Sequence, residues 1–352
     1  MRLSPRRWAL LAVPVAVAAA IGPVQPALRF ALSALAIVPL SALLGEATEH
    51  LAVRTGPTVG GLLNATLGNL AELIIATLAL RAGLVELVKA SITGSILGNL
   101  LLVLGAAQLA GGLRHHRQRF NPNLAGMNVA LLVIAALGLI IPALFHAAHP
   151  DPARVATVRM SEFVAALLML GYGLSLVYSM GTHRGSFAAA GEGHEAPGAV
   201  VWPIRRALLV LALAAAAIGY LSEVLVGATE AAAHVVGLSE FFVGLIVVPI
   251  IGNAAEHSSA VIMAVRDRMD LAVGIAIGSS VQVALLVAPL LVFAGLAMGR
   301  PMDLAFSTFE VASVALAVWV ASVIAIDAES NWLEGALLLI VYAMLAVAFF
   351  FF

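Results

Sequence analysis

Apolar runs long enough to cross a membrane follow one another along almost the whole of this 352-residue chain. A spanning α-helix needs about 20 predominantly apolar residues, and eleven runs are assigned on that basis, the first being the shortest. The chain is therefore predicted to be an all-α polytopic membrane protein with 11 transmembrane helices. Their expected spans are 8–22, 27–53, 57–81, 84–112, 123–145, 157–180, 204–236, 240–265, 270–297, 304–326 and 331–352.

Composition supports this class and removes others. Hydrophobic residues make up 62% of the chain, charged residues make up 11%, and the mean hydropathy is +1.07. These values are too apolar for a soluble domain of this length. A net charge of −1, with no basic face or aromatic platform, argues against a nucleic-acid partner. The sequence contains no cysteine, which excludes disulfides and thiolate metal sites.

Two nearly identical polar motifs interrupt the apolar runs. Gly-Asn-x-Ala-Glu occurs at residues 68–72 and again at 252–256, a separation of 256 − 72 = 184 residues. The same offset keeps its register over about 50 residues, which indicates an internal duplication. The matching pairs are Glu46 and Glu230, His50 and His234, Gly60 and Gly244, Asn69 and Asn253, Glu72 and Glu256, Gly94 and Gly278, and Ser95 and Ser279.

Each duplicated unit contains five expected helices. Because five is odd, the second unit enters the membrane from the opposite side, so the repeats are predicted to be inverted, as in many transporters. The expected organisation is an N-terminal transmembrane helix in 1–25, a first repeat in 26–180, a cytoplasmic linker in 181–203 and a second repeat in 204–352.

The distribution of basic residues predicts the orientation. Twelve of the 18 Lys and Arg residues fall on the side that holds the N-terminus, and six fall on the other side. The excess predicts a cytoplasmic N-terminus and, after eleven crossings, a C-terminus outside. The first segment, with Arg2, Arg6, Arg7 and a run of alanines, also resembles a signal peptide. We favour a retained helix.

The repeated motif predicts a cation site near the membrane midplane. Asn69 and Glu72 are three residues apart, so their side chains share one face of a helix, and so do Asn253 and Glu256. Two such helices would offer up to four carboxylate and two amide oxygens, approaching the six to eight hard ligands that calcium takes. The alternative is that these groups hydrogen-bond neighbouring helices, but their paired placement favours a site.

The next helix of each repeat carries supporting polar groups. Ser95 and Asn99 lie on one polar stripe in the first repeat, and Ser279 and Gln282 occupy the corresponding stretch of the second. Serine in a membrane helix often serves close packing. We expect the two amides to hold the neighbouring carboxylates in position.

Two carboxylates carry two negative charges, which one divalent cation or two protons neutralise. Neighbouring like charges and partial desolvation both favour the protonated form of a carboxyl group. Metal and protons would then exclude one another at the same atoms, which is the chemistry of an exchanger. A channel would need several weak sites along an open pore.

The sequence resembles a known family along nearly its whole length. Residues 68–76 and 91–105 are similar to the first signature region of the calcium/proton exchangers, the CAX branch of the cation/calcium exchanger superfamily, and 252–257 and 278–282 are similar to the second. Further similarities lie at 119–121, 182–184 and 329–336.

This resemblance implies a lone first helix followed by two inverted five-helix repeats, and alternating-access export of cytosolic Ca²⁺ in exchange for H⁺. It implies that Glu72 and Glu256 ligate the cation, with Asn69 and Asn253 beside them. The sodium/calcium exchangers, a sister branch, keep a carboxylate on the later helix where this chain has Asn99. Fewer fixed charges suit protons better than sodium as the counter-ion.

Other intramembrane groups carry weaker expectations. Glu46 and Glu230 are expected either to line the access path or to form hydrogen-bonded couples with the histidines four residues on. His257 is expected to sense pH beside Glu256 or simply to pack. The linker lacks the strongly acidic helix of many family members, because Glu192 and Glu195 are diluted by Gly and Ala.

The function expected from the sequence is thus a Ca²⁺/H⁺ antiporter of a prokaryotic plasma membrane, with Ca²⁺ as transported substrate and no cofactor or obligate protein partner. The alternative is a Na⁺ or K⁺/H⁺ antiporter of the same fold. An intramembrane enzyme is disfavoured, because no His-Glu-x-x-His motif and no Ser/His/Asp arrangement occurs.

Overall fold

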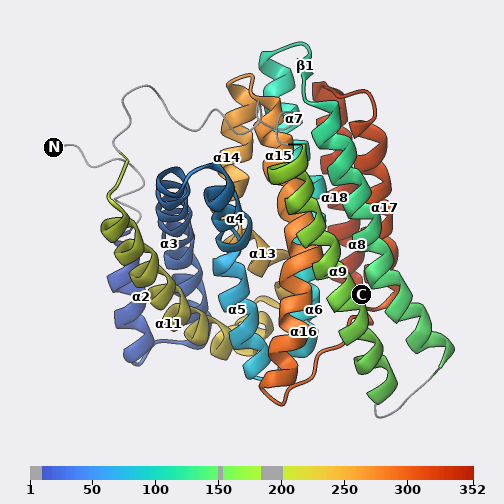
Figure 1. Ribbon diagram of the computed structural model, residues 1–352. Helices are drawn as coiled ribbons and strands as arrows, with labels where there is room; N and C mark the ends of the chain where they lie inside the picture. The colour runs from blue at the N-terminus through green and yellow to red at the C-terminus, as the bar shows by residue number, and fades with distance from the viewer. Residues whose placement is uncertain (1–9, 150–153, 184–200) are drawn as a thin grey trace. The chain divides into compact units, whose positions relative to one another are not determined.

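Helices account for nearly all of the chain in the computed structural model, which describes residues 10–149, 154–183 and 201–352 (Figure 1). Most of the expected linker, residues 184–200 with Glu192 and Glu195, lies outside the described residues, as do the first residues of the chain. The first described helix, α2, spans Ala12–Ile21.

The helices follow the expected apolar runs, and several runs are divided. The first half contains α3 (Pro26–Thr55), α4 (Pro57–Leu67), α5 (Leu70–Arg81), α6 (Val85–Leu97), the π-helical segment η1 (Gly98–Val103), α7 (Leu104–Arg114), α8 (Pro122–Ala148), α9 (Val155–Val177) and η2 (Tyr178–Thr182). The second half contains α11 (Ile204–Val236), α12 (Glu240–Phe242), η3 (Val243–Val247), α13 (Val248–Gly252), α14 (Ala254–Val265), α15 (Met269–Gln282), η4 (Val283–Val287), α16 (Ala288–Ala297), α17 (Thr308–Ala325) and α18 (Trp332–Phe351).

Membrane-spanning length is confirmed for most of these runs. Among the described residues, eight helices are long and apolar enough to cross a bilayer, or nine if the bent pair 240–252 and 254–265 forms one span. At 10, 11 and 12 residues, α2, α4 and α5 are too short to span singly. The multi-pass class is therefore confirmed, and the count of eleven stays a prediction.

The chain forms two compact units, and each unit draws on both sequence halves. Unit 1 comprises Met1–Ser91 and Val200–Ala255, and unit 2 comprises Ile92–Ala199 and Glu256–Phe352. Two of the three boundaries fall inside α6 and α14, and the boundary in α14 lies directly before Glu256. Each unit therefore combines a segment of the expected first repeat with a segment of the expected second.

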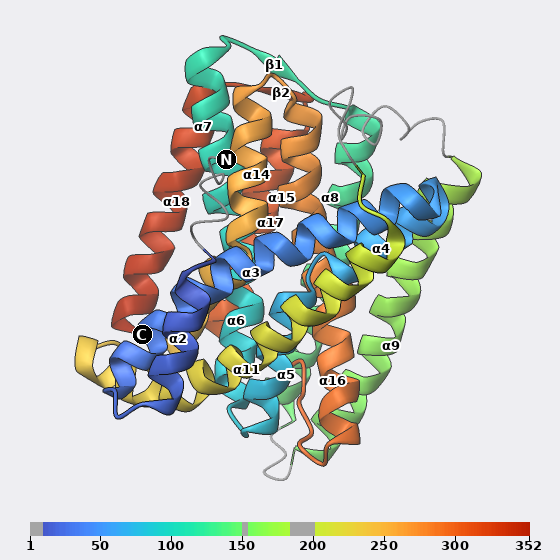
Figure 2. The same ribbon diagram turned by 90° about the vertical axis from the view of Figure 1, so that its left-hand side faces the viewer.

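Unit 1 is built on α3 and α11, which run side by side in opposite directions (Figure 2). Large apolar residues recur three or four positions apart on both helices, so each presents one continuous stripe to its partner. The helices α2, α5 and α13 pack against this pair. The buried core includes Ile37, Leu40 and Leu44 from α3, Ile75 from α5, and Ile218, Leu221 and Leu225 from α11.

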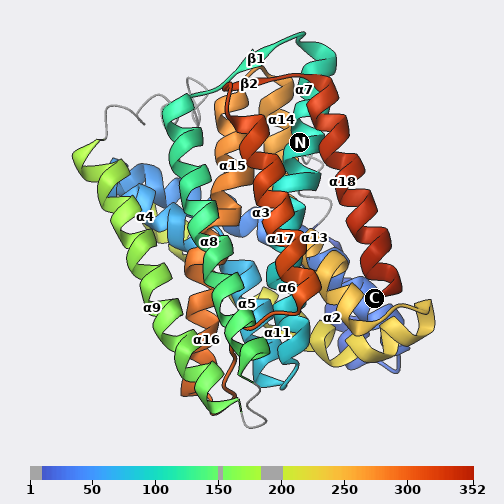
Figure 3. The same ribbon diagram turned by 90° about the vertical axis from the view of Figure 1, so that its right-hand side faces the viewer.

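Unit 2 contains a close helix pair, α7 and α18, which lie side by side in Figure 3. Glycines make this approach possible, because a Cβ atom at Gly335 would lie 2.3 Å from the backbone nitrogen of Leu109 and 2.6 Å from the carbonyl oxygen of Gly105. Small residues at such contacts let the backbones of membrane helices meet. Next to this pair, strands β1 (Gln118–Arg119) and β2 (Glu329–Ser330) form a short antiparallel ladder.

Replacing Gly335 by leucine is expected to destabilise unit 2, because the new side chain would overlap the α7 backbone. Overpacking of this kind typically costs about 1–3 kcal/mol. The thermal unfolding midpoint of the detergent-solubilised protein would fall. Gly126→Leu on α8 is the matched control, since no atom lies within 4 Å of a Cβ built there. Equal midpoints for the two variants would contradict this packing.

Candidate cation site

The first motif lies where its expected helix breaks. Gly68 and Asn69 separate α4 from α5, and Asn69 has φ −94° and ψ 21°, outside the α-helical region. Glu72 is the third residue of α5, and its side chain is only 4% exposed. The unpaired N–H groups and dipole at a helix N-terminus favour a negative charge. The break therefore sets a buried carboxylate at a favourable position.

The second motif repeats this local structure in an independent stretch of chain. Asn253 separates α13 from α14 with φ −105° and ψ 10°, close to the values at Asn69. The helices on either side are bent by 61°. Glu256 is the third residue of α14, the position that Glu72 has on α5. The two motifs thus share a break at asparagine with similar dihedral angles and a glutamate at the third position of the following helix.

Within unit 1 the beginning of the second motif packs against the first. A Cβ atom built on Gly252 would lie 3.8 Å from the Cβ of Glu72 and 3.9 Å from its Cα. Asn69 and Asn253, both in this unit, are 4% and 3% exposed. A side chain at position 252 would therefore be in van der Waals contact with Glu72.

Within unit 2 a hydrogen-bond chain fixes the Glu256 carboxylate. The Nδ2 of Asn99 donates to the Oγ of Ser279 over 3.1 Å. The hydroxyl of Ser279 donates in turn to the side chain of Glu256. The Oε2 atom of Glu256 has no hydrogen-bond partner among the residues that the structure describes. One carboxylate oxygen is thus positioned by an amide and a hydroxyl, and the other has none of these bonds.

The supporting groups occupy helices with matching irregularities. Asn99 lies in the π-helical segment η1, and η4 begins at Val283, which is its counterpart at the offset of 184. Such segments are uncommon and occur often at functional sites. Because Val283 has no polar group, the Asn99 bond to Ser279 has no equivalent at that position of the second repeat. Ser95 is buried at 1% exposure, whereas Gln282 is partly exposed.

The other expected residues lie away from these bonds or have other partners. The Oε1 atom of Glu46 lies 3.9 Å from Nε2 of His50, as expected for residues four apart on a helix. The Glu46 side chain is 41% exposed. Glu230 is exposed on α11. His257 is partly exposed and follows Glu256 directly on α14.

One buried polar contact and one aromatic contact had no sequence expectation. In unit 2 the hydroxyl of Thr93 donates to Oε1 of Glu310 over 2.9 Å, and Oε2 of Glu310 accepts from the backbone of Ser307. The Ser-x-x-Glu spacing of Ser307 and Glu310 is a sequence signal for a capping box, and it could have predicted the Ser307–Glu310 bond but not the bond to Thr93. In unit 1, the ring centroids of Trp202 and His50 lie 4.5 Å apart, with the ring planes tilted by 31°.

The chemistry of the two motifs suits a hard cation. Carboxylate, amide and hydroxyl oxygens are the ligands that calcium prefers. The described part of the chain contains no cluster of three or more His, Cys, Asp or Glu side chains that could hold a metal.

Known proteins are similar to this chain in sequence and in fold. The family model described as sodium/calcium exchanger protein matches residues 26–181 and 206–351. A Ca²⁺/H⁺ antiporter of Synechocystis sp. is 46% identical over 339 residues, covering 92% of this chain and 90% of the relative. The Ca²⁺/H⁺ antiporter ChaA of Bacillus subtilis is 40% identical, covering 96% of each chain.

A solved structure extends the similarity to three dimensions. The structure of native YfkE is similar with a TM-score of 0.85 and 37% sequence identity, covering 99% of this chain and 100% of the other. The sequence and structural similarities therefore agree over nearly the full length. The chain belongs to the sodium/calcium exchanger protein family and is similar to members named Ca²⁺/H⁺ antiporters.

Proposed function

We propose that this protein is a Ca²⁺/H⁺ antiporter that exports cytosolic Ca²⁺ in exchange for H⁺ by alternating access. The observation that carries the proposal is the matched placement of Glu72 and Glu256, each the third residue of a helix that follows a break at asparagine. The antiporter relatives support it, being similar over more than nine-tenths of this chain.

The proposed ligands are the carboxylates of Glu72 and Glu256 with the amide oxygens of Asn69 and Asn253. Their support comes from the sequence duplication, the matching helix breaks and the burial of Asn69, Glu72 and Asn253. The helix N-termini stabilise the ionised carboxylates that Ca²⁺ requires. Water and backbone carbonyls near the breaks would complete the shell.

Protons would replace Ca²⁺ by neutralising the same carboxylates. An ionised carboxylate only accepts hydrogen bonds, whereas a protonated one also donates. The Ser279 hydroxyl donates to ionised Glu256 and could accept from the protonated form, while Asn99 continues to hold the Ser279 oxygen. Ser279 and Asn99 would thus keep Glu256 oriented in both states.

The finer architecture belongs to the same proposal. We place eleven helices in a prokaryotic inner membrane, one N-terminal helix followed by two inverted five-helix repeats, with the N-terminus cytoplasmic. The excess of basic residues on the N-terminal side and the repeat register support this topology.

A cation panel tests the function. Inside-out vesicles containing the protein are given an imposed pH gradient, acidic inside, and Ca²⁺, Na⁺ or K⁺ is then added outside. The proposal expects Ca²⁺ to dissipate the gradient and to accumulate in the vesicles. Dissipation by Na⁺ or K⁺ and not by Ca²⁺ would instead establish a monovalent cation/proton antiporter.

Glu46 is proposed to attract cations along the access path, with Glu230 as its repeat counterpart. Glu46→Gln should raise the half-saturating Ca²⁺ concentration about threefold to tenfold without abolishing transport, because local negative charge concentrates cations. Uptake rates at several Ca²⁺ concentrations measure this effect. Glu86→Gln is the control, since that side chain is 72% exposed at the start of α6. Equal shifts in both variants would refute a specific role for Glu46.

A further inference from the structure

Glu310 is a buried carboxylate in unit 2 that the proposed transport site does not use. It is the third residue of α17 and is 1% exposed. Its Oε1 atom accepts a hydrogen bond from the Thr93 hydroxyl over 2.9 Å, and its Oε2 atom accepts from the backbone N–H of Ser307 over 3.0 Å. Ionisable residues within membrane-spanning segments are costly and usually serve a function. A role for Glu310 beyond packing is therefore to be expected.

The capping box at the start of α17 fixes the orientation of Glu310 and leaves one oxygen for another helix. The Ser307 hydroxyl accepts from the backbone N–H of Glu310, while Oε2 of Glu310 accepts from the backbone of Ser307. These reciprocal bonds complete the cap. The bond from Thr93 to Oε1 is not part of the cap, and it joins α17 to α6. Because Thr93 is 0% exposed, no water competes for this bond.

The Thr93 bond holds α6 at a point shortly before Asn99. Thr93 and Asn99 are six residues apart, which is about 1.7 turns of an α-helix, so their side chains leave the helix in different directions. Thr93 bonds to α17, and Asn99 bonds to Ser279 on α15. Both α17 and α15 pack against η1. Rotation of this helix about its axis would therefore strain or break both bonds.

The change from α-helical to π-helical hydrogen bonding falls between these two bonds. It occurs at Gly98, the residue before Asn99. Among the described residues no atom lies within 4 Å of a Cβ built on Gly98, so packing at this residue leaves room for the segment to shift. Segments of this kind occur often at functional sites. A bond that holds α6 just before the change would limit the movement of Asn99.

We propose that Glu310 is a positioning residue for transport, acting through Thr93 on Asn99. Its part is to hold η1 where the Asn99 amide reaches Ser279. Ser279 in turn donates to Glu256. Outer partners of this kind orient the ligands of a metal ion and tune its affinity. The inference rests on the proposed function, because it requires Glu256 to bind the cation.

Uptake of Ca²⁺ by the full chain in inside-out vesicles tests the proposal. Thr93→Val keeps the shape of the side chain but removes the hydroxyl. It should raise the half-saturating Ca²⁺ concentration about threefold to tenfold, with little change in maximal rate. Thr93→Ser keeps the donor and should recover most of the affinity. Glu310→Gln should shift the half-saturating concentration in the same direction as Thr93→Val, because it weakens the same bond from the other side.

A double-mutant cycle decides whether the effect passes through Asn99. In the Asn99→Leu protein the bond to Ser279 is already lost. Adding Thr93→Val to that protein should therefore change the half-saturating Ca²⁺ concentration by less than about twofold, since residues that act through a shared partner have non-additive effects. Effects that multiply in full would overturn the proposal, because Thr93 would then act by another route.

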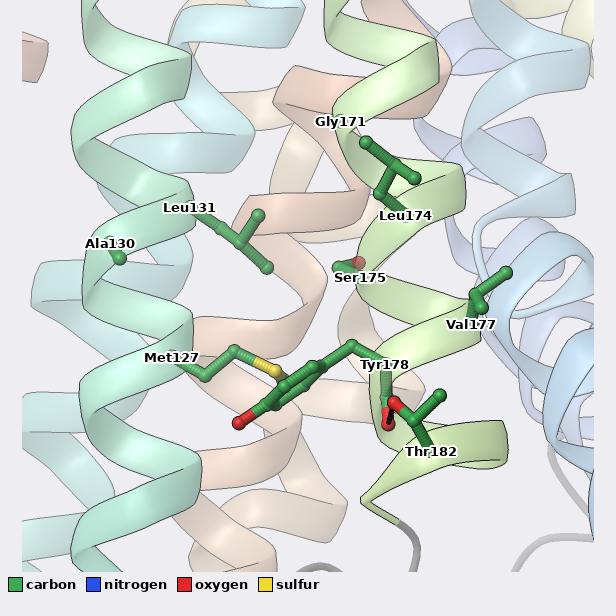
Figure 4. Close-up of a pocket in the computed structure, with 9 residues that line it drawn as sticks. All are labelled: Met127, Ala130, Leu131, Gly171, Leu174, Ser175, Val177, Tyr178 and Thr182. Carbon is green, nitrogen blue, oxygen red and sulfur yellow. Dashed lines mark hydrogen bonds between the residues drawn. The ribbon is translucent and has the colours of Figure 1, made fainter.

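Two other hydroxyl groups of unit 2 provide controls outside this chain of bonds. Ser175 lines the groove between α8 and α9 (Figure 4), and its hydroxyl donates to the carbonyl of Tyr172 on the same helix. Thr157 is 0% exposed, and its Oγ1 atom lies 3.2 Å from Nδ1 of His146 on α8. Ser175→Ala and Thr157→Val should keep the original half-saturating concentration. A shift in Thr157→Val equal to that in Thr93→Val would refute a specific role for Thr93.

Hydrogen exchange followed by mass spectrometry gives a readout that does not depend on transport. In detergent, Thr93→Val should speed the exchange of the amide hydrogens of η1 about tenfold relative to the unaltered protein and to Thr157→Val. Unchanged exchange in η1 would overturn the proposal. So would an unchanged half-saturating concentration in Thr93→Val when Glu256→Gln abolishes uptake, and the proposed function would then stand. Failure of the proposed function is distinct, because the unaltered protein would then take up no Ca²⁺, and the inference would fall with it.

Discussion

Glu256→Gln and Glu72→Gln are each expected to reduce proton-driven Ca²⁺ uptake by at least about 100-fold, because the amide carries no charge with which to bind calcium and cannot exchange a proton. Either substitution alone should suffice, since the proposal assigns one carboxylate to each motif. Uptake of radioactive Ca²⁺ into inside-out vesicles at a fixed pH gradient measures the loss. Glutamine preserves the size of the side chain, so the fold should be retained.

Glu162→Gln is the matched control for both variants, because Glu162 is a carboxylate within α9 that lies outside the two motifs. All three proteins should have the same elution volume and thermal unfolding midpoint in detergent. Near-normal uptake by either Glu72→Gln or Glu256→Gln would remove that residue from the site.

Asn99→Leu should weaken the apparent affinity for Ca²⁺ by about tenfold, because losing its bond leaves Ser279 free to turn away from Glu256. The half-saturating Ca²⁺ concentration for transport should rise, with a smaller change in maximal rate. Asn99→Gln, which retains the amide, should recover part of the affinity.

Asn128→Leu provides the comparison for Asn99→Leu, since Asn128 is a buried amide on α8 outside both motifs. A purely structural role for Asn99 would instead lower the amount of folded protein while leaving the half-saturating concentration unchanged. That pattern would contradict the positioning of Glu256 through Ser279.

Helix boundaries were predictable where the chain carries unambiguous stop and start residues. The helix expected at 204–236 agrees with α11 at both ends, because Pro203 precedes it and Gly237, with φ 72°, ends it. The π-helical segments were not predictable, since a change in backbone hydrogen-bond register within an apolar run has no distinctive side-chain pattern.

The two motifs that hold the proposed ligands can be found from the duplication in the sequence, but their hydrogen-bond partners cannot. Asn99 was expected to support a carboxylate directly, and its amide instead donates to Ser279, whose side chain bonds to Glu256. The supporting role of Asn99 stays a prediction. The pairing of Thr93 with Glu310 joins residues 217 positions apart, and no short-range pattern encodes such a contact. The division into two compact units could not be predicted from the sequence either, because each unit combines segments from both halves of the chain.

Proton release on Ca²⁺ binding tests most directly the claim that Ca²⁺ and protons compete for the same carboxylates. Purified protein in weakly buffered detergent solution at a pH where the site is protonated is titrated with Ca²⁺ while a pH indicator is followed. We expect stoichiometric release approaching about two protons per Ca²⁺, with tighter binding as pH rises. Glu72→Gln and Glu256→Gln should abolish the response. Tight Ca²⁺ binding without proton release at any pH would contradict the proposed exchange.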